Sequence, residues 1–75
     1  MDTGYWIHDG RIYGPLSYTG FWLQEDHIWG PNGDTGFWVE DGAIRGPEGD
    51  TKYRIATARI RGPQEQLPWR VGASN

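Results

Sequence analysis

The chain of 75 residues contains no cysteine, so neither a disulfide nor a thiolate metal site can stabilise its fold. No apolar run approaches the roughly 20 residues that a helix needs to cross a bilayer, and no membrane partner is expected. The first residues, Met1 to Gly4, carry neither a basic nor an apolar segment, so we expect no secretory signal and a cytoplasmic location. The length predicts a single domain over residues 1–75, which buries only a small share of its surface. Repetition, dense aromatic packing or self-association must therefore supply its stability.

Basic residues are also scarce, since seven Lys and Arg stand against ten Asp and Glu, for a net charge of −3. Phosphate neutralisation dominates nucleic-acid affinity, so we expect no general binding of nucleic acids. The charge is unevenly distributed: residues 1–42 hold seven acids and one base, whereas residues 43–75 hold three acids and six bases. These halves carry −6 and +3, a charge separation that can orient a partner or a second copy of the chain.

The sequence is rich in aromatic residues, and these recur in four copies of a 16-residue unit. The units cover residues 3–18, 19–34, 35–50 and 51–66, and residues 67–75 form a C-terminal tail. Each unit begins with threonine and carries Gly-Pro at its twelfth and thirteenth positions. Three further positions are always apolar, and they hold Tyr5, Phe21, Phe37 and Tyr53, then Ile7, Leu23, Val39 and Ile55, then Ile12, Ile28, Ile44 and Ile60.

Each unit has the pattern of a short β-hairpin. Asp9-Gly10 and Asp41-Gly42 are strong signals for a two-residue turn with positive φ. Glu25-Asp26 and Thr57-Ala58 occupy the same positions in the other units but are poorly suited to positive φ. The proline of Gly-Pro has no amide donor and is expected to end the second strand.

A two-residue turn fixes which residues lie opposite each other, and successive pairs point to opposite faces. One face then carries the twelve repeated apolar residues, which we interpret as the core. The predicted fold is all-β, with four hairpin repeats forming a small closed barrel or rosette of about eight short strands, because closure removes open edges. A β-solenoid with one unit per coil is the alternative. In the tail, Leu67-Pro68-Trp69 is expected to fold back over the last hydrophobic layer, and residues 71–75 are expected to be loose.

The other face holds only Trp, Tyr and Arg at its two central positions, grading from aromatic to cationic along the chain. These residue types are enriched in the hot spots of protein interfaces. The eight residues are Trp6, Tyr13, Trp22, Trp29, Trp38, Arg45, Arg54 and Arg61. We interpret them as one continuous surface for a protein partner or for self-association into a homo-oligomer, as in a small inhibitor or adaptor. Packing within the chain is a further possibility. A multivalent carbohydrate- or nucleotide-binding role is the alternative function, although equivalent sugar sites would not replace Trp with Arg54.

Catalysis has little support in the sequence, and we expect no enzyme and no cofactor. His8 and His27 occupy different positions in their units, which is typical of solvated surface residues. The acids Asp9, Glu25 and Asp41 share one position, but it is a turn position that favours such residues locally. No metal-ligand spacing is present, and the glycines punctuate hairpins rather than form a phosphate-binding loop.

The unit TGFWxxxxxIxGPxGD resembles the short hairpin-repeat proteins of unknown function found in bacteria and their phages, over about residues 3–66. It is also distantly similar to MORN repeats, which are serial hairpins rich in aromatic residues and glycine. This unit is shorter than a MORN repeat and carries Gly-Pro at a fixed place, so the membrane and scaffold roles of that family are not implied. The resemblance implies a serial hairpin fold and a non-catalytic role.

Overall fold

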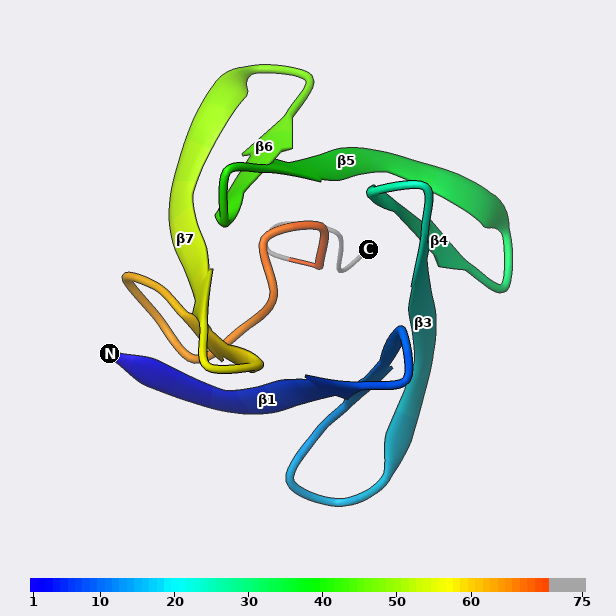
Figure 1. The fold of residues 1–75 in the computed structure, drawn as a ribbon, viewed down its shortest axis with the longest axis vertical. Helices are drawn as coiled ribbons and strands as arrows, with labels where there is room; N and C mark the ends of the chain where they lie inside the picture. Colours follow the sequence, from blue (N-terminus) through cyan, green and yellow to red (C-terminus); the bar gives the residue numbers. More distant parts are fainter. Residues whose placement is uncertain (71–75) are drawn as a thin grey trace.

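A computed structural model describes residues 1–70, which form eight antiparallel strands in a closed barrel (Figure 1). The strands are β1 (Asp2–His8), β2 (Arg11–Tyr13), β3 (Tyr18–Gln24), β4 (His27–Gly30), β5 (Gly33–Glu40), β6 (Ala43–Gly46), β7 (Gly49–Ala56) and β8 (Arg59–Arg61). Each strand pairs with the next, and β8 pairs with β1. The closed barrel predicted from the repeats is therefore confirmed, and the solenoid alternative is wrong because consecutive strands run antiparallel.

The four hairpin turns have the same backbone conformation in spite of their different sequences. Both turn residues have positive φ in Asp9-Gly10 and Asp41-Gly42, and equally in Glu25-Asp26 (54° and 67°) and Thr57-Ala58 (52° and 65°). This pattern of two positive φ angles defines the type I′ turn that suits twisted hairpins. The two turns with unfavourable residues are held by the flanking register, so strand pairing overrides the local preference of these side chains.

Each turn is also bound to the next unit. The backbone N–H of Leu23 donates to the carbonyl of Gly10 (2.6 Å), and corresponding bonds occur at the other three unit boundaries. At the closure of the barrel the donor is Ile7 and the acceptor is Ala58 (2.7 Å). The second residue of every turn thus supports the strand that follows it around the ring.

The threonine that begins each unit forms the joint between units. The hydroxyl of Thr19 donates to the carbonyl of Ile12 (2.6 Å) and accepts the backbone N–H of Phe21 (3.2 Å). The register shifts at each joint, as in a β-bulge, and Gly20 between these groups has φ of 90°. The hydroxyls of Thr3, Thr35 and Thr51 make the same pairs of bonds.

The glycine of each Gly-Pro pair lies under an aromatic ring of its own unit. A Cβ atom at Gly46 would lie 2.4 Å from Cε2 of Phe37, a distance that no real contact allows. The same close approach occurs between the pairs Gly14 and Tyr5, Gly30 and Phe21, and Gly62 and Tyr53. The glycine is therefore required by packing, a reason separate from the proline effect that the sequence indicates.

The core lies inside the barrel and contains one isoleucine from each unit. Ile12, Ile28, Ile44 and Ile60 are at most 1% exposed. The repeated aromatic residues and the aliphatic residues at the fifth position pack around them, with Tyr53 fully buried and the others partly buried. This arrangement confirms the predicted core face.

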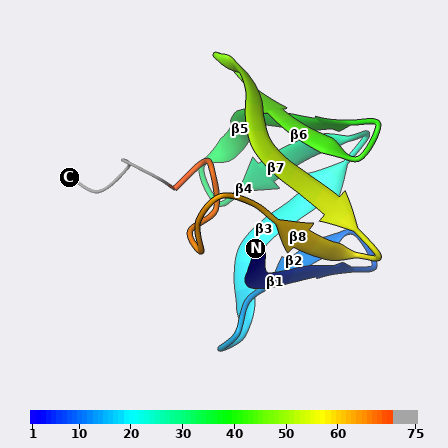
Figure 2. The same ribbon diagram turned by 90° about the vertical axis from the view of Figure 1, so that its left-hand side faces the viewer.

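The C-terminal tail closes one end of the barrel, opposite the type I′ turns (Figure 2). Leu67 is completely buried in the core, and Trp69 packs against the rings of Phe21 and Phe37. The hydroxyl of Tyr53 donates to the carbonyl of Gln66, and burial raises the pKa of this tyrosine. The expected fold-back is confirmed, although it reaches the second and third units as well as the last. The expectation for residues 71–75 lies outside the described residues.

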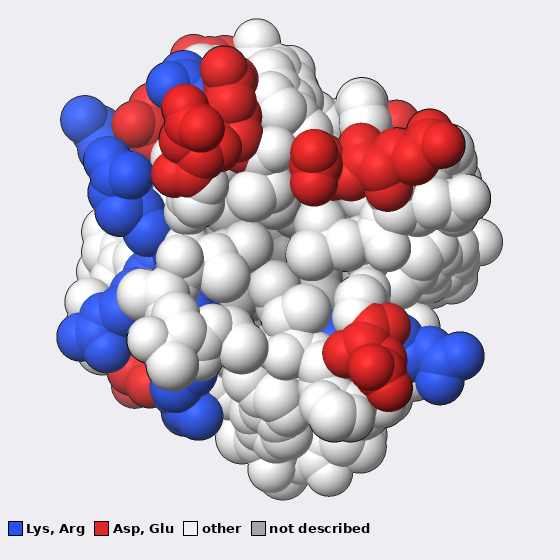
Figure 3. All heavy atoms as spheres, in the orientation of Figure 1, with Lys and Arg blue, Asp and Glu red and all other residues white. Residues whose placement is uncertain are grey.

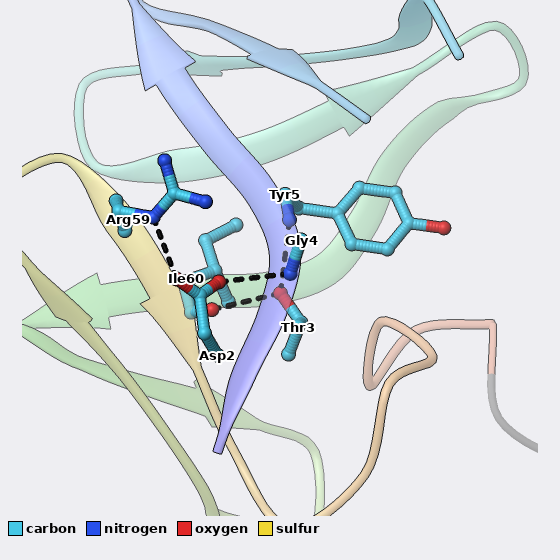
Figure 4. Close-up of polar contacts among 6 residues, drawn as sticks. All are labelled: Asp2, Thr3, Gly4, Tyr5, Arg59 and Ile60. Carbon is cyan, nitrogen blue, oxygen red and sulfur yellow. Dashed lines mark hydrogen bonds and ion pairs between the residues drawn. The ribbon is translucent and has the colours of Figure 1, made fainter. Parts of the chain in front are cut away.

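The seam between β1 and β8 repeats the joints between units and adds an ion pair (Figure 4). Thr3 donates to the carbonyl of Ile60 (2.7 Å), as its counterparts do elsewhere. Asp2 accepts the backbone N–H of Gly4 (2.8 Å) and pairs with the guanidinium of Arg59 (2.6 Å). The hydrogen bond from Arg59, with that from Gly4, lowers the pKa of Asp2 below its ordinary value of 3.8. The first and last strands are thus joined by side chains as well as by their backbones.

Replacing Ala58 with glycine should stabilise the protein by about 0.5–1 kcal/mol, because glycine adopts positive φ without the steric cost of a Cβ. The matched control is Ala56→Gly, at an exposed position in β7. That change should destabilise the protein by a similar amount, because glycine in a strand loses more conformational entropy on folding than alanine does. Urea denaturation measures both effects, and two changes of the same sign would contradict the strained turn.

Replacing Asp2 with asparagine should destabilise the protein at neutral pH, and the difference from the natural protein should vanish in acid. The folded-state pKa of Asp2 is lowered, so its stabilising effect is present above about pH 3.8 and is lost as the pH falls through the lower, folded-state value. Thermal melts at about pH 7 and over about pH 2–4 measure this change, with Glu25→Gln, in the turn between β3 and β4, as a control away from the seam. A deficit that persists unchanged at about pH 2 would contradict the charge-dependent seam.

Candidate functional site

The register places the eight predicted surface residues in four directly opposed pairs. Trp6 lies opposite Tyr13, Trp22 opposite Trp29, Trp38 opposite Arg45 and Arg54 opposite Arg61. In every hairpin the neighbouring pair belongs to the core, for example Leu23 opposite Ile28. Because alternate pairs point to opposite faces, all eight side chains lie on the outside of the barrel.

Six of these eight residues are half-buried, whereas Arg54 and Arg61 are exposed. The rings of Trp6 and Tyr13 stack at 5.8 Å with an angle of 13° between their planes. The indole N–H of Trp29 is buried and has no hydrogen-bond acceptor within residues 1–70. The rings therefore lie against their neighbours on the sheet and leave part of each face accessible.

Closure of the barrel divides the single surface that the sequence suggests. Strands β1 to β5 carry all the outward aromatic residues, which we call the aromatic arc: Trp6, Tyr13, Tyr18, Trp22, Trp29 and Trp38. Strands β6 to β8 carry the arginine arc: Arg45, Arg54, Arg59 and Arg61. Since β8 pairs with β1, the two arcs meet again where Trp6 lies opposite Arg59. The row of eight residues is thus a ring around a convex barrel, and its opposite sides face in opposite directions.

Sequence reasoning missed Tyr18 and Arg11 as members of the outer surface. Tyr18 is 42% exposed, and its ring lies 5.4 Å from that of Tyr13. The guanidinium of Arg11 lies 6.0 Å from the centre of the Tyr18 ring. Tyr18 stands at the last position of its unit, where Asp34 and Asp50 stand in the next two units. The replacement of aspartate by tyrosine at this position was the signal in the sequence that could have identified Tyr18 as part of the outer surface.

Two shallow recesses lie at equivalent unit boundaries on the outside of the barrel. One, of about 290 Å³, has Arg11, Tyr18 and Trp22 in its lining. The other, of about 320 Å³, has Arg59 and Trp6. In both, the tryptophan lies opposite an arginine of the preceding unit.

The pairing of a tryptophan with a basic residue of the preceding unit recurs at one of the other two boundaries. The third boundary pairs His27 with Trp38, and the fourth pairs Ala43 with Arg54. Three of the four boundaries therefore place an aromatic face beside a basic side chain.

Charge is distributed unevenly around the outside of the barrel. Arg45 pairs with Glu40 (3.4 Å) and His27 with Asp34 (3.3 Å). Arg54 and Arg61 have no carboxylate within ion-pair distance in the described part of the chain. Figure 3 shows most of the basic atoms on the left-hand side of the barrel and a smaller basic group at its lower right, with the acidic atoms in separate groups. The arginine arc is thus the cationic side of the molecule.

The candidate catalytic groups do not form a cluster. His8 and Asp9 make an exposed pair (3.6 Å) at one turn, and His27 lies in a different hairpin. Within residues 1–70, no group of three or more His, Asp and Glu side chains could hold a metal ion. The same residues include no helix that is both long and apolar enough to cross a membrane.

Comparison with family models, with curated proteins and with solved structures found no match to this chain. The resemblance to hairpin-repeat proteins therefore stays a prediction from the repeated unit.

Proposed function

We propose that this protein is a non-catalytic binding module, of the small inhibitor or adaptor type, whose aromatic arc contacts a protein partner. The observation that carries this proposal is that the outer side of five adjacent strands bears six aromatic rings. The core is already filled by the isoleucines, the inward aromatic residues and the tail. Outward rings that the core does not need favour contact with another molecule.

The size of the barrel supports a contact with one arc rather than the whole ring. A protein interface of ordinary size covers about 800 Å² on each partner. That is about one sixth of the accessible surface of 4921 Å². We therefore propose that Trp22 and Trp29, which are opposed in the middle of the aromatic arc, form the centre of the contact.

The arginine arc has a different role in this proposal. Exposed charges at the rim of an interface mainly steer association and fix orientation. Arg54 and Arg61 are exposed and lie on the cationic side, so they are suited to guiding an acidic partner. They also allow a second copy to approach, with its arginines against the aromatic arc of the first. Such a head-to-tail contact produces rings or filaments.

A second candidate function is multivalent carbohydrate binding. The observation that favours it is the recurrence of a tryptophan beside a basic side chain at three of the four unit boundaries. An exposed indole face can stack on the apolar face of a sugar ring, and the neighbouring base can bind its hydroxyls. Shallow repeated sites of this kind would bind weakly one by one and gain strength through multivalency.

Replacing Trp29 with alanine should weaken binding of a captured partner by about 2 kcal/mol, or about 30-fold, because central aromatic anchors dominate interface energy. Arg54→Glu should mainly slow association and change its salt dependence. Glu25→Ala, at an exposed turn, is the control, and circular dichroism checks the folding of each variant. The partner is obtained by pull-down from the host, and surface plasmon resonance and light scattering then measure affinity and oligomeric state.

Variants of Trp29 and Arg54 that stay folded, and that bind and assemble like the control, would rule out the aromatic arc as the functional surface. A titration with mono- and disaccharides separates the second candidate. Saturable binding of a sugar that is lost in Trp22→Ala, with no protein captured, would support the carbohydrate function instead.

A further inference from the structure

A groove of about 480 Å³ lies beside the tail, at the end of the barrel opposite the type I′ turns. Its apolar lining residues are Phe37, Pro47, Pro63 and Pro68, together with the buried Tyr53. Aromatic and proline side chains form rigid surfaces, so this groove loses little conformational entropy when it receives a ligand. It belongs to the third and fourth units and is separate from the aromatic arc.

The repeat indicates what kind of group packs against such a ring. Phe37 and Tyr53 are the repeat equivalents of Phe21 and Phe37, which stand sixteen residues earlier in the sequence. Trp69 of the tail packs against that earlier pair, with ring-centre distances of 5.5 Å to Phe21 and 5.9 Å to Phe37. The neighbouring Arg70 places its guanidinium 5.9 Å from the centre of the Phe21 ring. In the protein itself, the group that packs against Phe21 and Phe37 is thus a tryptophan followed by an arginine.

The free groove carries more negative charge than its occupied counterpart. Glu48 and Asp50 line the free groove, whereas the residues at the same positions of the second unit are Asn32 and Asp34. Asp50 accepts the backbone N–H of Lys52 (2.8 Å), so one of its oxygens is already engaged. Glu48 is exposed and has no basic side chain within ion-pair distance in residues 1–70. Glu48 is therefore the acid available to a cationic ligand.

We propose that the groove beside Phe37 and Pro68 binds a segment of a partner protein in which a tryptophan is followed by arginine. The indole packs against Phe37 and the prolines, and the guanidinium lies beside Glu48. The segment comes from a different protein, because the only Trp-Arg sequence of this chain, Trp69-Arg70, is already packed against its own barrel. This site does not depend on the function proposed for the aromatic arc.

The test titrates the full chain with the blocked peptide acetyl-Leu-Pro-Trp-Arg-amide, followed by calorimetry and by NMR of the backbone amides. Saturable binding is expected, with shifts at Gly46 and Gly49, which line the groove. A peptide with alanine in place of its tryptophan should not bind. The Trp29→Ala variant, changed in the aromatic arc, should bind the peptide like the natural protein. Failure of the groove proposal can therefore be distinguished from failure of the proposal for the aromatic arc.

Charge reversal provides the matched pair of variants. Glu48→Lys should weaken peptide binding at least tenfold, whereas Asn32→Lys, at the equivalent position of the occupied groove, should leave the affinity unchanged. Both residues are exposed in loops, so folding is preserved. Three results would each overturn the proposal: no saturable binding, shifts confined to Gly30 and Gly33, or equal affinity in the two lysine variants. The second result would mean that the peptide displaces Trp69 rather than entering the free groove.

Discussion

The hydrogen bond from each unit's threonine hydroxyl to the isoleucine carbonyl of the preceding unit is the interaction on which the barrel depends. At this point the register shifts, so the regular ladder cannot satisfy the carbonyl. The same hydroxyl accepts the N–H of the aromatic residue two positions later, which sets the strand that carries the inward ring. Because the fourth copy of this bond joins Thr3 to Ile60, the joint that links successive units also closes the ring.

The residues that hold the barrel together are different from those of its outer surface. The inward ring lies on the glycine of its own unit, and the isoleucines fill the centre, so the interior is complete without any outward side chain. The tail then breaks the fourfold symmetry, because one Leu67 and one Trp69 cannot occupy four equivalent places. The grooves between units therefore differ from one another, and the groove beside Tyr53 and Pro68 has two acids, Glu48 and Asp50, in its lining.

The sequence predicts the repeat, the two faces and the pairing of Trp22 with Trp29, because two-residue turns fix the register by simple counting. It does not reveal why glycine precedes each proline, since the ring of Phe37 reaches Gly46 only in three dimensions. Threonine looks like a mere alignment marker until its hydroxyl is seen at the bulge. The division of the outer face into two arcs depends on ring closure, and the groove depends on where Trp69 lies. Neither can be read from local spacing.

Ring closure also decides when the protein can fold during its synthesis. β1 is synthesised long before β8, its second neighbour, and the hydrogen bond from Thr3 to Ile60 across this seam links residues 57 positions apart. Until residue 61 has been added, the growing chain can form only hairpins and open sheets, and an isolated two-stranded hairpin is marginally stable in water. The nascent chain therefore exposes unpaired strand edges until β8 has emerged, and only then can the ring of strands close.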